Sequence, residues 1–569
     1  MFHLRALCLR HSAFAALLCT AMLPPSALSE ILRFAAQGDI ATLDPHAKND
    51  RFNNAMVQHL YEPLALRGPD LKVIPGLALT WVQVPQKDNK IPLWRVTLRP
   101  SVTFHEGQPF TADDVVFSIT RAQSPQSHLQ SAASSLGRVR RIDATTVEFD
   151  TMKPNPLFIE TLTLIPIMSQ AWAKAHGAEQ PGNLSANQET YAHRHANGTG
   201  PLRNAVWKPD ISLTMDANSN WWARANEGKA SGGNLGNVTQ VLFTPLQSVS
   251  TRVAALATGA VDLVVDLSPN DRAYLASNKA LKTVSGLENR IIYFGFDVKS
   301  PHLRHGTLAD NPLQKSQVRQ ALWQAIDYAT LQKQVLKGDH LPTGAMVTAL
   351  TTGYDPALNT LPRYDPTAAR AQLAQACYPN GFTLGLNCPS DRHPVDEVLC
   401  KAVTNFWSKV GVQARLRLQP KTQYFAELEK TGADVFLMGW GGATTDAMYS
   451  LKPLVHSAVS STNGTSSFGS VAGKFNYGGI VDPSLDVLID KAEIEQNPAL
   501  RKTLLLQALQ KVKQEAYVIP LFQQAILWGM QSRINAVPRA DNRLEIFRVQ
   551  VETSAVNVGS VTTRNIPAQ

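Results

Sequence analysis

The side chains best suited to catalysis are concentrated in "TFHEGQPFTADDVVFSITRAQ", residues 103–123. His105 and Glu106 could act as a general acid and base, and Asp113 and Asp114 could act as paired carboxylates. A zinc protease helix would carry a second histidine four residues after the first, and no histidine follows at that spacing. The residue types therefore suit acid–base chemistry, whereas their spacing does not give a metal site.

The same stretch also fits the start of a helix. A turn is predicted at 107–109, Thr111 is the predicted N-cap, and Asp114 follows three residues later as its partner in a capping box. Asp113 and Asp114 then lie in the first turn, where the helix dipole stabilises carboxylates. Apolar residues follow at the spacing of a buried stripe: Val115, Val116 and Ile119. We therefore predict that this stretch is scaffold and not a catalytic site.

Three other patterns that could do chemistry are incomplete. His193 and His195 lie two residues apart in a predicted loop, with no apparent third metal ligand. "SGGNLG" (231–236) and "GWGGA" (439–443) are glycine-rich but lack the Lys and Ser/Thr of a phosphate-binding loop. The sequence contains no Gly-x-Ser-x-Gly elbow. We therefore predict no enzyme activity, no metal site and no cofactor.

The N-terminus, residues 1–29, is predicted to be a signal peptide. Arg5 and Arg10 precede an apolar run, and Ala27-Leu28-Ser29 place small residues at both recognition positions of a cleavage site. A membrane anchor is the weaker alternative, because the run is about half of the ~20 residues that span a bilayer. Lipidation of Cys19 is another alternative, but Leu17-Leu18 lacks the small residues that such a site requires. This signal peptide leads us to expect export to the periplasm. No later segment is apolar enough to cross a membrane.

The composition is that of a soluble globular protein. Removing the signal peptide takes away two of the 54 Lys and Arg and none of the 45 Asp and Glu, which leaves a net charge of +7. The basic residues are dispersed, so nucleic-acid binding has no support. A mature chain of this length exceeds a single hydrophobic core, and we expect two or three domains.

The mature chain contains three cysteines, and an oxidising compartment would allow two of them to pair. Cys388 ends an apolar strand pattern, and Cys400 lies twelve residues later in a helix pattern. We predict a disulfide between them, which would contribute about 3 kcal/mol. Three unpaired buried thiols, with Cys377 as the third, are the alternative. The spacing fits no zinc site.

Strand and helix patterns alternate through residues 382–440. "FTLGLNC", residues 412–418 and "DVFLMGW" have strand patterns, and helix patterns connect them. This order predicts a parallel sheet covered by helices. Ligands bind beyond the carboxyl ends of such strands. Two segments therefore form a candidate site: "CPSDRHP" (388–394) and "WGGATTDAMY" (440–449).

The 103–123 stretch does not stand alone. Seven further blocks follow one another along the chain: "LDPH" (43–46), "YEPL" (61–64), "GTGPL" (198–202), "VRQALWQAID" (318–327), "YDPTAARAQLAQACYPNGF" (364–382), "MGW" (438–440) and "IPLFQQ" (519–524). In type and order they resemble the extracytoplasmic solute-binding proteins of the peptide/nickel family (family 5), the receptors of peptide-importing ABC transporters. The resemblance covers nearly all of the mature chain.

The resemblance implies an α/β, two-lobed periplasmic-binding-protein-like fold (type II) that closes over a ligand on a two-stranded hinge. Lobe one would comprise residues 30–290 and 529–569, with an extra subdomain at about 64–190, and lobe two would comprise 291–528. The hinge strands are expected at "NRIIYFGFD" (289–297) and "AILWGM" (525–530).

The resemblance also implies how a peptide would be held. In dipeptide-binding relatives an Asp three positions after the Trp of "MGW" binds the peptide amino group, but Ala443 occupies that position here. Either Asp446 takes over this role or the ligand has no amino terminus there; a helix cap or turn is the alternative for Asp446. An Arg about fifty residues before the Trp binds the carboxylate in these relatives, and Arg392 lies 48 residues before Trp440. A solvated loop Arg and a core Trp are the alternatives.

The ligand-binding residues that we predict are Arg392, Trp440, Gly441, Gly442, Ala443, Thr444 and Asp446. The implied function is that of a monomeric periplasmic receptor, which delivers a peptide or peptide-like solute to an inner-membrane ABC permease complex. Ala443 leaves open a non-peptide ligand: a nickel chelate, haem, an opine or an oligosaccharide. An exported hydrolase or chaperone-like peptide holder is a third hypothesis, without a recognisable nucleophile.

Overall fold

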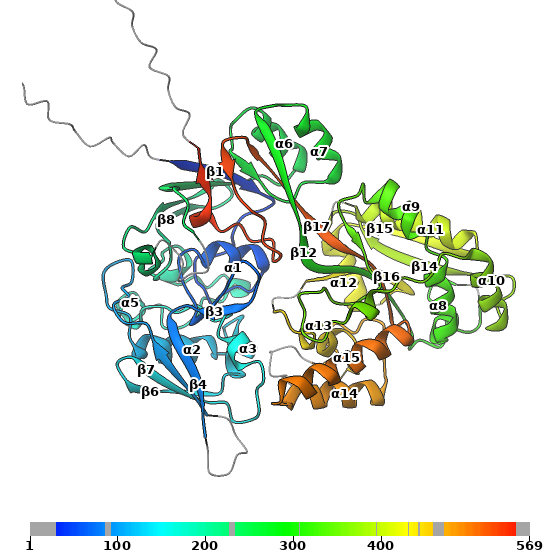
Figure 1. Ribbon diagram of the computed structural model, residues 1–569, viewed down its shortest axis with the longest axis horizontal. Coiled ribbons are helices and arrows are strands. Elements are labelled where there is room, and N and C mark those ends of the chain that lie inside the picture. The colour runs from blue at the N-terminus through cyan, green and yellow to red at the C-terminus, as the bar shows by residue number, and fades with distance from the viewer. Residues whose placement is uncertain are drawn as a thin grey trace, which may run out of the picture.

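The computed structural model describes residues 30–85, 93–226, 234–306, 308–393, 395–430, 432–441, 444–458 and 472–552. These residues form two lobes that lie side by side and are joined by two long strands, β12 (Leu281–Phe296) and β17 (Val518–Gln531) (Figure 1). The predicted two-lobed α/β fold with a two-stranded hinge is therefore confirmed. The predicted signal peptide, 1–29, lies outside the described residues.

An eleven-stranded sheet runs through both lobes in the order β15-β14-β16-β12-β17-β11-β1-β10-β9-β8, with β13 paired to β17. Its other strands are β1 (Ile31–Ala36), β8 (Leu202–Lys208), β9 (Ser212–Ala217), β10 (Gln240–Pro245), β11 (Leu263–Val264), β13 (Leu341–Pro342), β14 (Phe382–Pro389), β15 (Val412–Gln419) and β16 (Val435–Gly441). Strands β1 and β8 to β11 belong to lobe one, and β14 to β16 belong to lobe two.

The hinge is the antiparallel pair β12 and β17. Residues 281–287 of β12 pair with the end of β17 beside lobe one, and residues 291–295 pair with its beginning beside lobe two. The register shifts between these two halves, so the chain crosses from one lobe to the other at 288–290. The lobe boundaries stay a proposal: 30–290 with 529–569, and 291–528. The strand pairing favours a second crossover near Gln524, a few residues before the proposed position.

Lobe two has the predicted strand–helix alternation. Strand β14 pairs in parallel with both β15 and β16, and α11 (Asp396–Ser408) and α12 (Lys421–Lys430) connect them. Cys388 at the end of β14 forms a disulfide with Cys400 in α11, as predicted, and Cys377 is a free, exposed thiol. The remaining helices of this half are α8 (Ser316–Gln324), α9 (Tyr328–Thr330), α10 (Pro366–Gln375), α13 (Met448–Leu454), α14 (Pro483–Ile494) and α15 (Pro498–Gln514).

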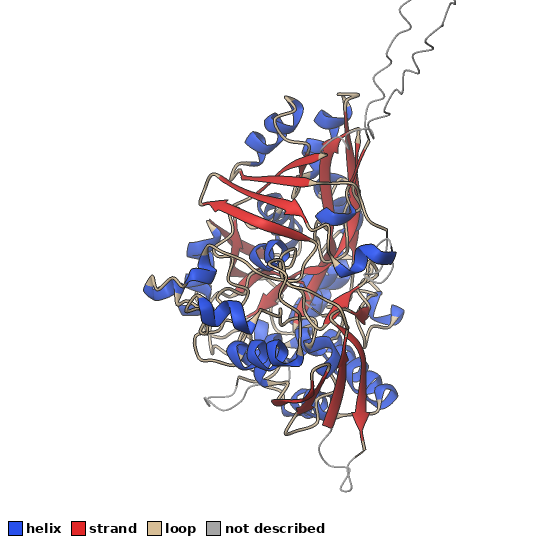
Figure 2. Cartoon of the chain, turned by 90° about the vertical axis from the view of Figure 1, so that its left-hand side faces the viewer, coloured by secondary structure: helices blue, strands red, loops and turns tan. Residues whose placement is uncertain are grey.

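Lobe one also contains a separate four-stranded sheet in the order β4-β5-β7-β6. Figure 1 shows it at the opposite end of the lobe from β1 and β8, and Figure 2 shows the strands and helices of the chain from the side. Its strands are β4 (Ala78–Val84), β5 (Leu93–Leu98), β6 (Arg138–Asp143) and β7 (Thr146–Asp150). The helices of this half are α1 (Arg51–Val57), α2 (Ala112–Ala122), α3 (Gln130–Ser134), α4 (Phe158–Thr161), α5 (Gln170–Ala175), α6 (Val249–Ala257) and α7 (Pro269–Ala276). Two-stranded pairs complete the fold: β2 (Ala65–Arg67) with β3 (Val73–Pro75), and β18 (Ile534–Asn535) with β19 (Gln550–Val551).

The 103–123 stretch contains the helix start that the sequence predicted. Thr111 and Asp114 form the expected capping box at the start of α2. The His105 ring contacts the Gly200 carbonyl at 3.1 Å from Nε2, which ties the turn to the "GTGPL" block. At the other end of α2, buried Arg121 makes a bidentate ion pair with Asp44 of "LDPH" at 2.9 and 2.6 Å. The sequence blocks thus meet in space to fix lobe one.

Each lobe is held by its own buried apolar clusters. One cluster packs α8, α10 and α11 against β14 to β16, and another packs the strands of lobe one against α1 and α5. The four-stranded sheet and α2 enclose a third cluster. Among the described residues, none of the helices is both long and apolar enough to cross a membrane.

Candidate functional site

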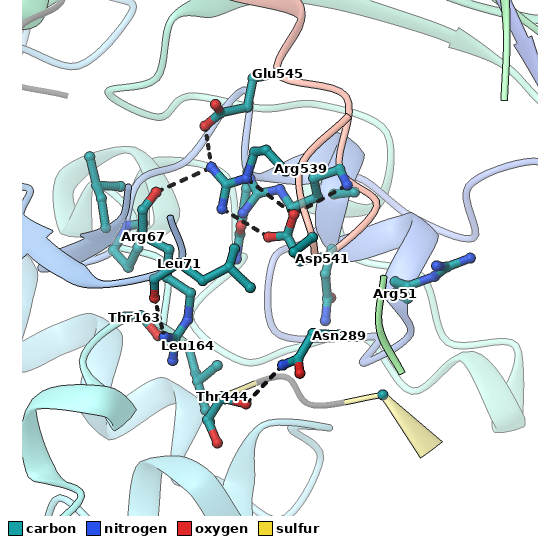
Figure 3. A pocket seen from close by; sticks show the side chains of 18 of the residues that line it. Arg51, Arg67, Leu71, Thr163, Leu164, Asn289, Thr444, Arg539, Asp541 and Glu545 are labelled. Atoms are coloured by element: carbon teal, nitrogen blue, oxygen red, sulfur yellow. Dashed lines mark hydrogen bonds and ion pairs between the residues drawn. The ribbon is translucent and has the colours of Figure 1, made fainter. Parts of the chain in front are cut away.

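A cavity of about 340 Å³ lies between the lobes at the hinge. Lobe one contributes residues of α1, of the chain around Glu62 and Arg67, and of the segment 539–547 that follows β17. The crossover contributes 288–290, and lobe two contributes residues of the loop after β16. Figure 3 shows Arg539, Asp541 and Glu545 at one end of this cavity and Asn289 with Thr444 at the other. Both lobes therefore meet around it.

Five arginines and five carboxylates line the cavity: Arg51, Arg67, Arg290, Arg539, Arg543, Asp50, Glu62, Glu288, Asp541 and Glu545. Most of these charges neutralise one another within the wall. Arg539 makes a bidentate pair with Asp541 at 3.1 and 2.9 Å and a third bond to Glu545 at 2.5 Å. Arg67 pairs with Glu160 outside the cavity.

Glu288 lies at the crossover and is 2% exposed. Its Oε1 accepts hydrogen bonds from Arg51 Nη1 at 3.0 Å and from Arg290 Nε at 2.9 Å. Its Oε2 is buried and has no hydrogen-bond partner among the described residues. Burial raises the pKa of Glu288, but Arg290 and Arg51 outweigh this effect and hold the pKa below its usual value. The carboxylate is therefore ionised at neutral pH, with one oxygen unused.

Arg543 belongs to the segment 539–547. In the described part of the chain its guanidinium makes no hydrogen bond, and its Nε is buried without a partner. The nearby carboxylate of Asp541 is already engaged by Arg539. Burial and the neighbouring Arg539 lower the pKa of Arg543. Asp541 and Glu545 stabilise the charge of Arg543 from nearby, but this cation of the cavity wall has no hydrogen-bonded carboxylate among the described residues.

Glu62 of the "YEPL" block is a second buried carboxylate of the wall. It accepts hydrogen bonds from Trp221 Nε1 at 3.0 Å, Trp222 Nε1 at 2.9 Å and Thr199 Oγ1 at 2.8 Å. Burial raises the pKa of Glu62 to about 7, because these neutral donors offset the loss of hydration only in part. Glu62 therefore gains a proton far more readily than Glu288.

Two of the predicted ligand-binding residues, Gly441 and Thr444, do line the cavity. A Cβ at Gly441 would lie 3.0 Å from the guanidinium carbon of Arg290, so the glycine lets this side chain lie across the backbone. The Thr444 carbonyl faces Asn289 Nδ2 at 3.5 Å, and the buried Thr444 Oγ1 has no partner among the described residues. Gly442 and Ala443, which were predicted beside them, lie outside the described residues.

Trp440 and Asp446 lie behind the cavity wall instead. The Trp440 indole donates to the Tyr449 carbonyl at 3.1 Å and packs against the Phe475 ring. Asp446 is 5% exposed and makes a bidentate ion pair with Arg501 of α15. It also accepts the backbone N–H of Met448 at 2.9 Å. These contacts favour the structural alternatives for both residues.

Arg392 follows β14, as predicted, but does not line the cavity. Its Nη2 donates to the Gly439 carbonyl at 2.8 Å, and its guanidinium lies 4.8 Å from the centre of the Phe425 ring. Burial and the nearby Arg290 lower the pKa of Arg392. In this geometry Arg392 supports the end of β16, and direct binding of a ligand stays a prediction.

Sequence reasoning missed Glu288 and Arg543. Glu288 lies just before the predicted hinge strand, where a charged residue at the start of an apolar run could have been noticed. Arg543 lies in "RADNRLE" (539–545), in which nothing distinguishes it from Arg539. His193, a candidate metal ligand, contacts Glu189 at 3.1 Å. Within the described ranges no three His, Cys, Asp or Glu residues gather to hold a metal ion.

Comparisons with known proteins agree with this architecture. The model of the bacterial extracellular solute-binding proteins, family 5, middle region, matches residues 72–462. The glutathione-binding protein GsiB of Salmonella paratyphi A is 26% identical over 440 residues, 76% of this chain and 78% of that protein. GsiB of Escherichia coli O157:H7 is 24% identical over 502 residues, 87% of this chain and 89% of that protein.

Solved structures show the same fold. The periplasmic binding protein DppA from Helicobacter pylori, in complex with the peptide STSA, has a TM-score of 0.70 at 20% identity and covers 92% of this chain and 98% of its own. The substrate-binding protein CtaP from Listeria monocytogenes has a TM-score of 0.76 at 18% identity and covers 92% of this chain and 99% of its own.

Proposed function

This chain belongs to family 5 of the bacterial extracellular solute-binding proteins, and from this premise we propose that it is the receptor of an ABC importer for a small peptide or peptide-like solute. The ligand binds in the cavity between the lobes and is passed unchanged to an inner-membrane permease complex. The observation that carries the proposal is the cavity at the crossover, which residues of both lobes line and which contains groups of both charges. A ligand held there contacts both lobes, and closure strengthens each polar contact by excluding water.

The size of the cavity argues for a short ligand. Its volume of about 340 Å³ is at the lower end of the range for small-molecule sites. A long extended peptide would need a larger groove, whereas a dipeptide or tripeptide is of the right order. The relatives named glutathione-binding proteins indicate one tripeptide that deserves a direct test.

The residues that we propose as ligand contacts in lobe two are Gly441 and Thr444, together with Gly442 and Ala443 of the same loop. Arg392, Trp440 and Asp446 are proposed to support this loop and the end of β16. Asp446 is engaged by Arg501, so it is poorly placed to replace the missing carboxylate at Ala443. A peptide amino group must then find another partner in the cavity.

A ligand without a peptide amino group is the second candidate, and the alanine at position 443 favours it. Solved structures of this fold include proteins bound to agropinic acid and to a nickel–histidine complex. An opine or a metal chelate is therefore tested alongside peptides, together with haem and an oligosaccharide.

We also propose where the protein is located in the cell and in which form it acts. Residues 1–29 direct export and are removed, and the mature receptor is a periplasmic monomer without catalytic activity. The family membership supports an extracytoplasmic location and a solute-binding role. A ligand recovered unaltered after prolonged incubation is the expected result for a receptor, and a cleaved ligand would revive the hydrolase hypothesis.

Calorimetry on protein that has been unfolded, stripped of ligand and refolded tests the proposed function. The probes are dialanine, trialanine and reduced glutathione, with agropinic acid and nickel–histidine as the competing class. We expect saturable binding of at least one peptide and a more compact scattering profile when it is bound. Binding of a non-peptide probe alone would overturn the peptide assignment.

A further inference from the structure

The cavity wall contains one cation and one anion that the protein does not fully satisfy. Arg543 keeps an intact planar fork of N–H donors, because no described residue accepts from it and its Nε is buried. Such a fork matches the two oxygens of a carboxylate. A buried donor without an acceptor is costly, so a ligand carboxylate would remove a penalty that the unliganded protein bears.

The neighbours of Arg543 do not remove this penalty. Arg539, four residues earlier, engages both oxygens of Asp541, and Glu545 accepts from Arg539 and from Arg548. The carboxylates of the segment 539–547 are therefore committed to other arginines. Arg543 is the arginine of this segment that is left for a partner from outside the chain.

Glu288, a residue that lines the same cavity at the crossover, is the anion that the protein does not fully satisfy. Arg51 and Arg290 both donate to Oε1, and the buried Oε2 has no partner among the described residues. An unused carboxylate oxygen at this depth suits an ammonium group, which offers three donors and a full positive charge. The Thr444 hydroxyl of lobe two has no partner within the described part of the chain and offers a further polar contact.

We propose that the cavity binds a zwitterionic small peptide, with a carboxylate of the ligand on the Arg543 guanidinium and its ammonium group on Oε2 of Glu288. This rests on the proposed function and adds to it a polarity: the acid end faces lobe one, and the amine end faces the crossover between the lobes. The two residues take the places that Arg392 and position 443 were expected to fill.

Modified ligands test this on the unchanged protein. The probe is the peptide among dialanine, trialanine and reduced glutathione that binds most tightly, compared with its N-acetylated and C-terminally amidated forms. Each modification is expected to weaken binding by at least about 30-fold, the factor that corresponds to 2 kcal/mol for a buried charge pair. Equal affinity of all three forms would overturn the proposal.

Substitutions of Arg543 and Glu288 then test which end of the peptide each residue binds. Arg543→Gln is expected to lose about 30-fold or more for the free peptide and to bind the amidated form as the wild type does. Glu288→Gln is expected to show the same behaviour toward the acetylated form. Arg138→Gln and Glu179→Gln, at exposed positions outside the cavity, are matched controls that should bind normally.

The outcomes separate this inference from the proposed function. If peptides bind but neither substitution nor end modification matters, the polarity is wrong and the receptor function stands. If no peptide binds the wild type, both are overturned. Circular dichroism of each variant distinguishes a lost contact from a lost fold, and the modified ligands give a result even if a variant does not fold.

Discussion

Two buried carboxylates, Asp446 and Glu288, differ in whether the protein completes their hydrogen bonds. Asp446 and Arg501 satisfy each other with two hydrogen bonds, and Arg501 Nε also donates to the Ala492 carbonyl at 3.0 Å. At the cavity, Oε2 of Glu288 and the Arg543 guanidinium have no partner among the described residues. Both Asp446 and Glu288 are at most 5% exposed. Burial of a charge therefore does not by itself identify a binding residue, and the binding residues that we propose differ from Asp446 in having an incomplete set of partners.

The largest effect on stability is expected for Asp446→Asn, which breaks the ion pair between Asp446 and Arg501. Arg501 would be left as an uncompensated buried cation, and loss of one partner of such a pair costs about 3–5 kcal/mol. The free energy of unfolding, measured by urea denaturation, should fall by this amount, while the affinity of the folded variant for its peptide should change little.

Asp113→Asn is the matched control, because Asp113 and Arg141 form the same kind of pair at 2.6 Å with both side chains about half exposed. That pair should contribute between ~0 and 1 kcal/mol. A stable Asp446→Asn variant that has lost its ligand would show that Asp446 binds the amino group after all. The distinction between completed and incomplete pairs would then fail.

Glu62 extends the comparison to a buried carboxylate that has only neutral donors, and Glu62→Gln is expected to alter the pH dependence of stability. The pKa of about 7, against a usual 4.5, means that the folded state holds more protons than the unfolded state between these values. Stability from this group is therefore present at pH 4.5 and lost as the pH rises to 7, by about 3 kcal/mol.

The measurement is the difference in unfolding free energy between the wild type and Glu62→Gln at several pH values from 4.5 to 8. Subtraction cancels the other titrating groups that both proteins share. The wild type should lose about 3 kcal/mol relative to the variant across this window. A flat difference for Glu62→Gln would mean that folding does not raise the proton occupancy of Glu62, and the comparison could not be extended to this carboxylate.

The fold could be predicted further than the site. Strand–helix alternation predicted the parallel sheet of lobe two, and the pairing of Cys388 with Cys400 followed from two neighbouring elements. The cavity is lined by residues as distant along the chain as Gln58 and Phe547. A hydrogen bond between their neighbours His59 and Ile546 spans 487 positions. Sequence spacing cannot show that Asp541 engages Arg539 rather than Arg543. Sequence spacing also cannot show that Asp446 pairs with Arg501, 55 positions away.

The smallest effect is expected for Arg392→Gln. It sharpens the comparison between completed and incomplete sets of partners, because the same change at Arg543 should strongly reduce the affinity for the peptide. Arg392 already donates to the Gly439 carbonyl and lies over Phe425, so its replacement should cost about 1 kcal/mol of stability. Affinity for the free peptide should stay within about threefold, since the expected change in binding is below 1 kcal/mol. Calorimetry of both variants with one peptide compares them directly. If Arg392→Gln weakened binding more than Arg543→Gln, the carboxylate would lie at the end of β14, as the family resemblance implied. The ligand would then have to reach past Gly439 into lobe two.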